Sequence, residues 1–192
     1  SNGKTTTKEI SYLLLSFLTD KKSIFKSPKN WNNELGLSLS LLGLNRKHKI
    51  GIFEIGTNRP GEIYLLSNFL KPDYGVITNI GRSHLEKLKN LDGVAKEKSD
   101  LFINVKNKGV CLARIDNKYR KLISKKAIGK ELKLLGNETK DIFDLNFEVA
   151  YLIVKEILNL ERNSNLDLSE IKKRIQENLK IPGRMEKING PK

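Results

Sequence analysis

The chain opens with Ser1-Asn2-Gly3-Lys4-Thr5-Thr6-Thr7, which matches the second half of a phosphate-binding loop. In such loops, backbone N–H groups and the positive end of the next helix surround a polyphosphate. A lysine reaches the outer phosphates, and the following hydroxyl holds Mg²⁺. Gly3, Lys4 and Thr5 fit these three roles, with Asn2 and Thr6 beside them. The complete motif also has an earlier glycine and a preceding strand, which we expect upstream. We therefore predict nucleotide binding at this end of the chain.

The composition is typical of a globular protein and favours one domain. The chain has 192 residues, of which 38% are hydrophobic and 30% are charged. No apolar run approaches the roughly 20 residues that a membrane-spanning helix needs, and we expect no membrane span. The single cysteine, Cys111, lies in an apolar string that reads as a buried strand, and it has no intramolecular disulfide partner. A reducing cytoplasm is therefore expected, and we expect a monomer.

The net charge of +14 raises the question of nucleic-acid binding. Clustered lysine and arginine side chains would neutralise phosphates along a strand. Here the lysines are scattered, and the sequence contains neither an arginine-rich run nor a repeated aromatic–basic motif. We expect anionic small molecules as partners rather than nucleic acid.

Strand-like and helix-like segments alternate along the first two thirds of the chain. Strands are predicted at residues 23–26, 49–54, 74–78 and 109–113, and helices at residues 6–18, 34–44, 60–69 and 91–105. Two further amphipathic helices are predicted at residues 143–160 and 168–179, followed by a turn and another strand after residue 181, whereas residues 119–136 give no clear pattern. This alternation predicts an α/β fold with a doubly wound, mostly parallel sheet and helices on both faces. Ligands bind beyond the carboxyl ends of such strands.

Glu54 and His84 follow predicted strands and are candidates for this edge of the sheet, and Lys98, in a predicted helix, is a third residue to weigh. Glu54 ends an apolar strand, where an acid can bind Mg²⁺ directly or through water; its alternative interpretation is a solvated strand end. His84 lies just past the next strand, so a second metal site is plausible beside the alternative of a polar helix-start residue. Lys98 by itself is typical of an exposed helical lysine.

Five segments in order strengthen this interpretation. They are SNGKTTTKE (1–9), NWNNELG (30–36), FEIGTNRPGEI (53–63), ITNIGRSHLE (77–86) and GVAKEKSDLF (93–102). Together they resemble the phosphate-loop central domain of the Mur ligases, and the paired asparagines and the N-R-P-G-E-I string resemble the MurF branch of that family. The resemblance covers roughly the first hundred residues nearly continuously.

The resemblance implies an ATP-dependent amide ligation in peptidoglycan precursor synthesis. ATP would phosphorylate the terminal carboxylate of UDP-N-acetylmuramoyl-tripeptide, and the amine of D-alanyl-D-alanine would attack the acyl phosphate. It also implies that Lys4 and Thr5 serve the phosphates and a first Mg²⁺ together with Glu54, and that His84 serves a second Mg²⁺. Lys98 aligns with the lysine that these ligases carbamylate, with Lys96 kept as an alternative.

The resemblance is thinner in the last third of the chain. Asn146 resembles the asparagine of the family that contacts adenine, and Arg184 resembles the arginine that contacts phosphate. The Gly-x-His-Asn element that usually precedes this asparagine is replaced by Lys-Asp-Ile-Phe at residues 140–143. Residues 109–144 are also fewer than is usual in the family.

We expect residues 1–192 to be the central ATP-binding domain, without the UDP-sugar-binding and C-terminal domains of the family, and to be inactive alone. Three alternatives remain at this point. The first is another amide ligase of the same family, the second is a phosphate-loop NTPase or kinase with an unmodified Lys98, and the third is a basic nucleic-acid-binding module.

Overall fold

A computed structural model describes residues 3–136, 141–160 and 167–181 of the chain. The strands are β1 (Ile24–Lys26), β2 (Ile50–Ile52), β3 (Tyr74–Ile77), β4 (Val110–Arg114) and β5 (Glu131–Leu135). The α-helices are α1 (Lys4–Leu18), α2 (Glu34–Leu42), α3 (Glu62–Leu70), α4 (Leu85–Leu88), α5 (Leu91–Ser99), α6 (Arg120–Lys126), α7 (Ile142–Leu158) and α8 (Leu168–Asn178). Three short 3₁₀ helices complete the described elements: η1 (Lys21–Ser23), η2 (Asp100–Asn104) and η3 (Asn117–Tyr119).

The described strands form two parallel sheets. β1 pairs with β2, with Ile24 opposite Ile50, and the second sheet has the order β3-β4-β5. In that sheet Val110 of β4 lies opposite Tyr74 of β3 and Glu131 of β5. Parallel neighbours need a crossover connection, and α2, α5 and α6 lie in the chain between the paired strands. The predicted α/β fold with parallel strands is thereby confirmed.

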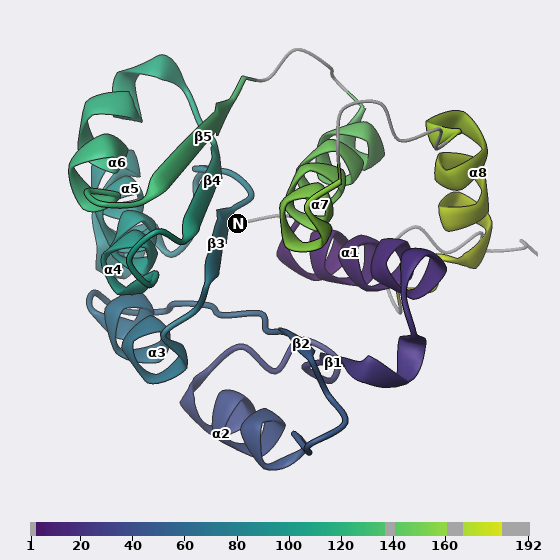
Figure 1. Cartoon of the computed structure of the whole chain (residues 1–192). Coiled ribbons are helices and arrows are strands. Elements are labelled where there is room, and N and C mark those ends of the chain that lie inside the picture. Colours follow the sequence, from purple (N-terminus) through teal and green to yellow (C-terminus); the bar gives the residue numbers. More distant parts are fainter. Residues whose placement is uncertain (1–2, 137–140, 161–166, 182–192) are drawn as a thin grey trace, which may run out of the picture.

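Helices cover both faces of the larger sheet (Figure 1). On one face, Ile77 and Cys111 belong to a buried cluster that includes residues of α3, α5 and α6. Val76, the neighbour of Ile77, packs instead against a second cluster built by α1, α7 and α8. This division follows from the alternation of side chains along a strand. The alternation puts the carboxyl end of β3 between the start of α1 and the helices of the first cluster.

The helix α1 forms where the apolar spacing predicts it. Ile10, Leu14 and Leu15 are buried with at most 1% of their surface exposed, and they pack in the cluster that contains α7. Burying side chains of this size stabilises the fold by about 1.5–3 kcal/mol each. This packing fixes the axis of α1 and therefore the place of its N-terminus.

Two segments differ from the sequence-based expectation. The helix expected over residues 91–105 stays α-helical only to Ser99 and continues as η2. Residues 119–136, which gave no pattern, form α6 and β5. Their apolar residues alternate with lysines, but Ile123 is completely buried and holds α6 against the sheet. The strand expected after residue 181 lies outside the described residues.

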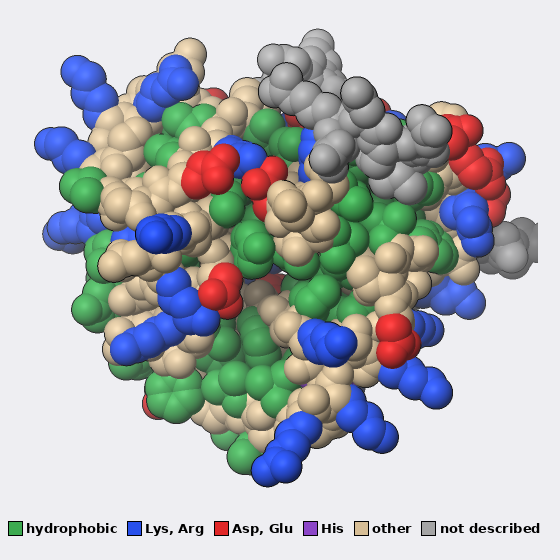
Figure 2. All heavy atoms as spheres, viewed as in Figure 1, with side chains coloured by type: hydrophobic (Ala, Val, Ile, Leu, Met, Phe, Trp, Pro, Cys, Tyr) green, Lys and Arg blue, Asp and Glu red, His purple; other side chains and the backbone are tan. Residues whose placement is uncertain are grey.

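The charged side chains do not gather on the face shown in Figure 2. Lysine and arginine side chains are dispersed around the edge of this face, between apolar and acidic groups. Among the described residues, no helix is both long enough and apolar enough to cross a bilayer.

Candidate nucleotide and metal site

The phosphate-binding loop ends in a glycine that the fold requires. Gly3 caps α1 with φ 92°, in the left-handed region that favours glycine. A Cβ at this position would lie 2.4 Å from Oδ1 of Asn146 on α7. The Gly3 carbonyl accepts the first helical bond, from the N–H of Thr7 at 2.8 Å. The chain therefore enters α1 with the N–H groups of its first turn directed away from the helix, a geometry that suits a phosphate.

Thr5 and Glu54 lie next to each other at this end of α1. Glu54 follows β2 and is 5% exposed. Its Oε2 accepts a 2.8 Å hydrogen bond from the Thr5 hydroxyl, and its Oε1 accepts one of 2.8 Å from the Asn32 side chain. A hydroxyl and a carboxylate in contact are the hard oxygen ligands that Mg²⁺ prefers.

The oxygen ligands at Thr5 and Glu54 fit a magnesium ion that is shared with a nucleotide. No group of three or more His, Cys, Asp or Glu side chains within residues 3–136, 141–160 and 167–181 could enclose a metal. Mg²⁺ commonly takes one or two protein ligands and completes its shell with phosphate oxygens and water. The Thr5 hydroxyl and the Glu54 carboxylate could supply the protein oxygens for that mode of binding.

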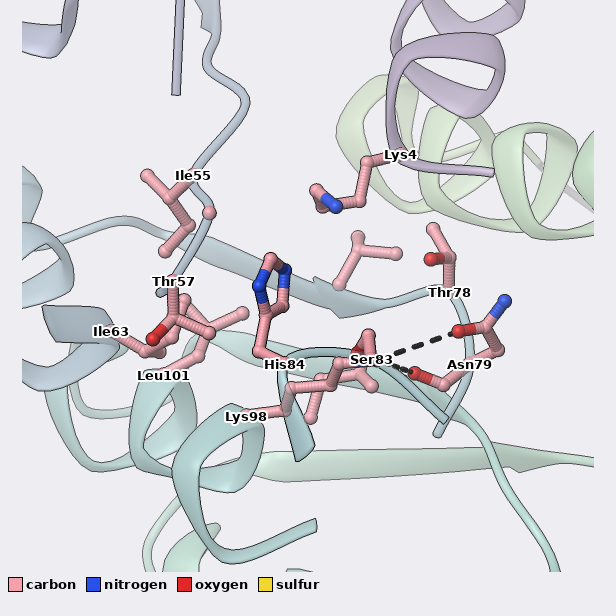
Figure 3. Close-up of a pocket in the computed structure, with 13 residues that line it drawn as sticks. Lys4, Ile55, Thr57, Ile63, Thr78, Asn79, Ser83, His84, Lys98 and Leu101 are labelled. Atoms are coloured by element: carbon pink, nitrogen blue, oxygen red, sulfur yellow. Dashed lines mark hydrogen bonds between the residues drawn. The ribbon is translucent and has the colours of Figure 1, made fainter. Parts of the chain in front are cut away.

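Two lysine side chains and an imidazole line a cavity beside the loop (Figure 3). Lys4 enters from the start of α1, whereas His84 and Lys98 enter from the opposite side, from the N-cap of α4 and from α5. The other polar lining side chains include Thr78 and Asn79, which follow β3. The predicted edge beyond the strands thus brings together Lys4, His84 and Lys98.

Lys98 differs from an ordinary surface lysine. Its Nζ donates to the backbone carbonyl of Asn79 at 2.6 Å and lies 3.4 Å from Oδ1 of the same residue. Burial, with a further contribution from the nearby Lys4, lowers the pKa of Lys98 to about 7. Lys96, the alternative raised by the sequence, is exposed and does not line the cavity.

His84 adopts a left-handed backbone conformation, with φ 54°. Its imidazole lines the cavity, and burial together with the charges of Lys4 and Lys98 lowers its pKa. A neutral imidazole is the form that coordinates a metal. Left-handed φ values are uncommon for residues with a Cβ, and they concentrate at functional sites.

Glu54 does not line this first cavity, but a second one continues toward it. That cavity lies between the start of α2 and α3, and Lys4 and His84 line both cavities. Asn32, which bonds Glu54, lies on its wall, and Leu65 and Leu66 of α3 form an apolar side. Lys4 and His84 thus connect the Thr5–Glu54 pair with the cavity that holds Lys98.

Asn146 lies beside the phosphate-binding loop. Its Oδ1 accepts a 3.2 Å hydrogen bond from the Thr7 hydroxyl, and its Nδ2 donates to the carbonyl of Ile142 at 2.8 Å. This places it beside the predicted nucleotide site, as part of the contact between α1 and α7. Asn2 and Arg184 lie outside the described residues.

Besides Arg114, two buried charged residues were not singled out from the sequence. Lys8 is 4% exposed, and its Nζ donates to the carbonyls of Ser27, at 2.9 Å, and Lys29. Glu97 is also 4% exposed, and its carboxylate accepts from the N–H groups of Gly61 and Ile63 at the start of α3. One signal was available for Lys8, because it shares a helical face with the buried Ser11 and Leu15.

Comparisons with known proteins agree with this geometry. The model of the Mur ligase middle domain matches residues 1–189. The UDP-N-acetylmuramoyl-tripeptide–D-alanyl-D-alanine ligase of Borreliella burgdorferi is 34% identical over 167 residues, which is 87% of this chain and 33% of that protein.

Solved structures give the same result. A crystal structure of MurF from Acinetobacter baumannii has a TM-score of 0.80 at 24% identity, over 97% of this chain and 46% of that one. MurF from Thermotoga maritima in complex with ADP has a TM-score of 0.70 at 28% identity, over 84% of this chain and 44% of that one. The chain therefore spans less than half the length of these relatives.

Proposed function

Because the chain belongs to the Mur ligase family, whose middle domain it matches over nearly its whole length, we propose that it is the ATP-binding part of a MurF-type ligase. The reaction joins D-alanyl-D-alanine to UDP-N-acetylmuramoyl-tripeptide. A carboxylate oxygen of the tripeptide attacks the γ-phosphorus of ATP, forming an acyl phosphate and ADP. The amine then attacks the acyl carbon, loses a proton, and releases inorganic phosphate as the amide forms.

One observation supports the proposal most strongly: Lys4, the lysine of the loop, lies close to the other predicted site residues. Lys4 lines the same cavity as His84 and Lys98, and its neighbour Thr5 is hydrogen-bonded to Glu54. These residues are separated by up to 94 positions in the sequence. Their convergence at the carboxyl edge of the strands supports phosphoryl transfer, in which positioned cations neutralise charge on the transferring group.

We assign the phosphates of ATP to the start of α1. The N–H groups of the first turn and the Lys4 ammonium would hold them, and Thr5 and Glu54 would hold the first Mg²⁺. That ion would supply charge neutralisation on the transferring phosphate. Asn146, beside Gly3, is kept as the proposed adenine contact, and Asn2 and Arg184 as proposed phosphate contacts.

We assign a carbamate to Lys98. An amine with a pKa of about 7 is largely neutral slightly above neutrality, and a neutral amine adds to CO₂ with loss of one proton. The product is an anion with two oxygens, so a cation would become a metal ligand. With His84, it would serve a second Mg²⁺. Of the two lysines considered, only Lys98 lines the cavity, which favours it over Lys96.

The ligation also needs two substrates besides ATP, and their positioning contributes much of the catalysis. We propose that residues 1–192 bind nucleotide but do not complete the reaction by themselves. We also propose that the enzyme is a monomer and that it works in the cytoplasm, where ATP is available.

The test is a comparison of phosphate release with and without D-alanyl-D-alanine. A full-length ligase containing this domain is expected to release phosphate only when both the tripeptide substrate and the dipeptide are present. The isolated chain is expected to bind an ATP analogue in the presence of Mg²⁺ without turnover. Phosphate release that is independent of the amine would instead assign the chain to the phosphate-loop NTPases. Binding to DNA or RNA that ATP does not affect and that falls steeply with salt would indicate a nucleic-acid module.

A further inference from the structure

We propose that Lys8 is a positioning residue that holds the loop of residues 27–33 so that Asn32 and Glu54 are set for the metal. The inference rests on the proposed function. Lys8 contacts neither the proposed nucleotide nor the proposed metal. It acts through the Glu54 carboxylate.

The first support is the environment of the Lys8 ammonium. A lysine is almost never fully buried unless its charge is compensated. Nζ donates to the Ser27 carbonyl at 2.9 Å and to the Lys29 carbonyl, and it lies 3.6 Å from Glu9 and 4.0 Å from Glu54. The two carbonyls flank Pro28, so a single cation on α1 fixes the start of the loop.

The second support is the conformation of the loop itself. Lys29 has φ 45°, a left-handed conformation that is unfavourable for a residue with a Cβ. The carbonyl of this residue accepts a hydrogen bond from Lys8. A hydrogen bond from a charged donor is stronger than one between neutral groups, so this bond offsets part of that cost. Without the ammonium, residues 27–33 are expected to relax at this point.

The third support is the link from the loop to the acid. Asn32 donates its side-chain N–H to Glu54 Oε1 at 2.8 Å, and its backbone carbonyl accepts from the N–H of Gly56 at 2.6 Å. The Ser27 hydroxyl accepts from the N–H of Glu54 at 3.2 Å. Lys8 therefore holds the start of a segment that contacts Glu54 from two sides, through Ser27 and through Asn32. Partners of this kind orient metal ligands, and their removal typically weakens metal binding about 10–100-fold.

The position of the loop can be measured without any ligand. Trp31 is the single tryptophan of the chain. Its backbone N–H donates to the Pro28 carbonyl at 3.1 Å, inside the segment that Lys8 holds. Lys8→Met and Lys8→Gln are expected to increase the quenching of Trp31 fluorescence by acrylamide. Lys26→Met is the matched control. The Lys26 ammonium pairs with the same Glu9, but it does not hydrogen-bond to residues 27–33. Unchanged quenching in both Lys8 variants, or an equal change in Lys26→Met, would overturn the inference.

The consequence for the metal is measured by titrating Mg²⁺ against binding of an ATP analogue to the chain. In Lys8→Met the half-saturating Mg²⁺ concentration is expected to rise about tenfold, while analogue binding without Mg²⁺ stays the same. Lys8→Gln keeps a neutral NH₂ donor group. If the methionine variant folds poorly, the half-saturating Mg²⁺ concentration is compared between Lys8→Gln and the unmodified chain.

A double variant shows whether Lys8 acts through Glu54. The Lys8→Met change is expected to add nothing to the effect of Glu54→Gln on the Mg²⁺ dependence. Additive effects, or equal weakening of binding with and without Mg²⁺, would leave Lys8 a purely structural role and refute the proposal. If the unmodified chain bound no nucleotide, the proposed function would fail, and the fluorescence comparison would still decide whether Lys8 holds the loop.

Discussion

Replacing Glu97 by glutamine should destabilise the protein through the start of α3. The Glu97 carboxylate accepts hydrogen bonds from the N–H groups of Gly61 at 2.7 Å and Ile63 at 2.9 Å, and from the Thr57 hydroxyl at 3.1 Å. Glu97, on α5, therefore satisfies two N–H groups at the N-terminus of α3. Its negative charge at that end also interacts favourably with the dipole of α3.

The magnitude follows from what glutamine removes. One carboxylate oxygen becomes an NH₂ group, so one of the two backbone N–H groups faces a donor. An unsatisfied buried N–H costs about 1–3 kcal/mol, and the lost interaction with the helix dipole adds about 0.3–1 kcal/mol. We expect a loss of about 1.3–4 kcal/mol in the free energy of unfolding. For a chain of this size, that corresponds to a decrease in Tm of about 3–16 °C.

The assay is urea unfolding followed by circular dichroism, together with hydrogen exchange at the amides of Gly61 and Ile63. Exchange at these two amides should become faster in Glu97→Gln, because they lose their acceptor or its charge. Glu177→Gln, on the exposed surface of α8, is the control for the same chemical change and should stay within about 0.5 kcal/mol of the unmodified chain. If Glu97→Gln is as stable as this control, the carboxylate does not stabilise α3 and the reasoning fails.

Three further outcomes are expected. Gly3→Ala should abolish nucleotide binding and lower the Tm, since its Cβ would lie 2.4 Å from Asn146 Oδ1 at a backbone φ of 92°; normal binding would contradict the described loop geometry. Thr5→Val should remove the Mg²⁺-dependent part of nucleotide binding measured by calorimetry, because it deletes the hydroxyl beside Glu54, and unchanged Mg²⁺ dependence would exclude that pair as the metal site. With ¹³CO₂, a carbamate carbon signal should be present at pH 8, decrease as the pH falls through about 7 and the Lys98 amine becomes protonated, and be absent in Lys98→Met; a signal that persists in Lys98→Met would assign the carbamate elsewhere.

Local patterns in the sequence were sufficient for the elements that place the site. The apolar spacing of α1 predicts which side chains pack on α7, and the apolar string before Glu54 predicts a strand that ends at an acid. Both depend on side-chain periodicity, which local sequence contains. The sequence also predicted that Lys4 and His84 lie at one edge, because the carboxyl ends of parallel strands share that edge, whereas Lys98 was assigned to the site only through the resemblance to the family.

Long-range partners explain what the sequence did not reveal. The burial of Lys8 depends on two carbonyls that lie 19 and 21 residues away, and the role of Glu97 depends on a helix start more than 30 residues away. A lysine or glutamate on a helix is usually solvated, so nothing local marked Glu97, and the one local signal for Lys8 was the helical face that it shares with Ser11 and Leu15. The segment that forms α6 and β5 was unassigned for a related reason, since lysines interrupt the periodicity of the apolar residues that hold it to the sheet.

The meeting of Lys4 and the N-terminus of α1 at one cavity also bears on how fast an anionic ligand arrives. A lysine ammonium and the positive end of a helix, in a recess with low-dielectric walls, focus the electric field outward, which speeds the diffusional encounter with a polyanion. Dissolved ions screen that field over about 8 Å at physiological ionic strength. The association rate of nucleotide should therefore fall as salt is added, whereas the dissociation rate, set by the direct contacts, should change much less.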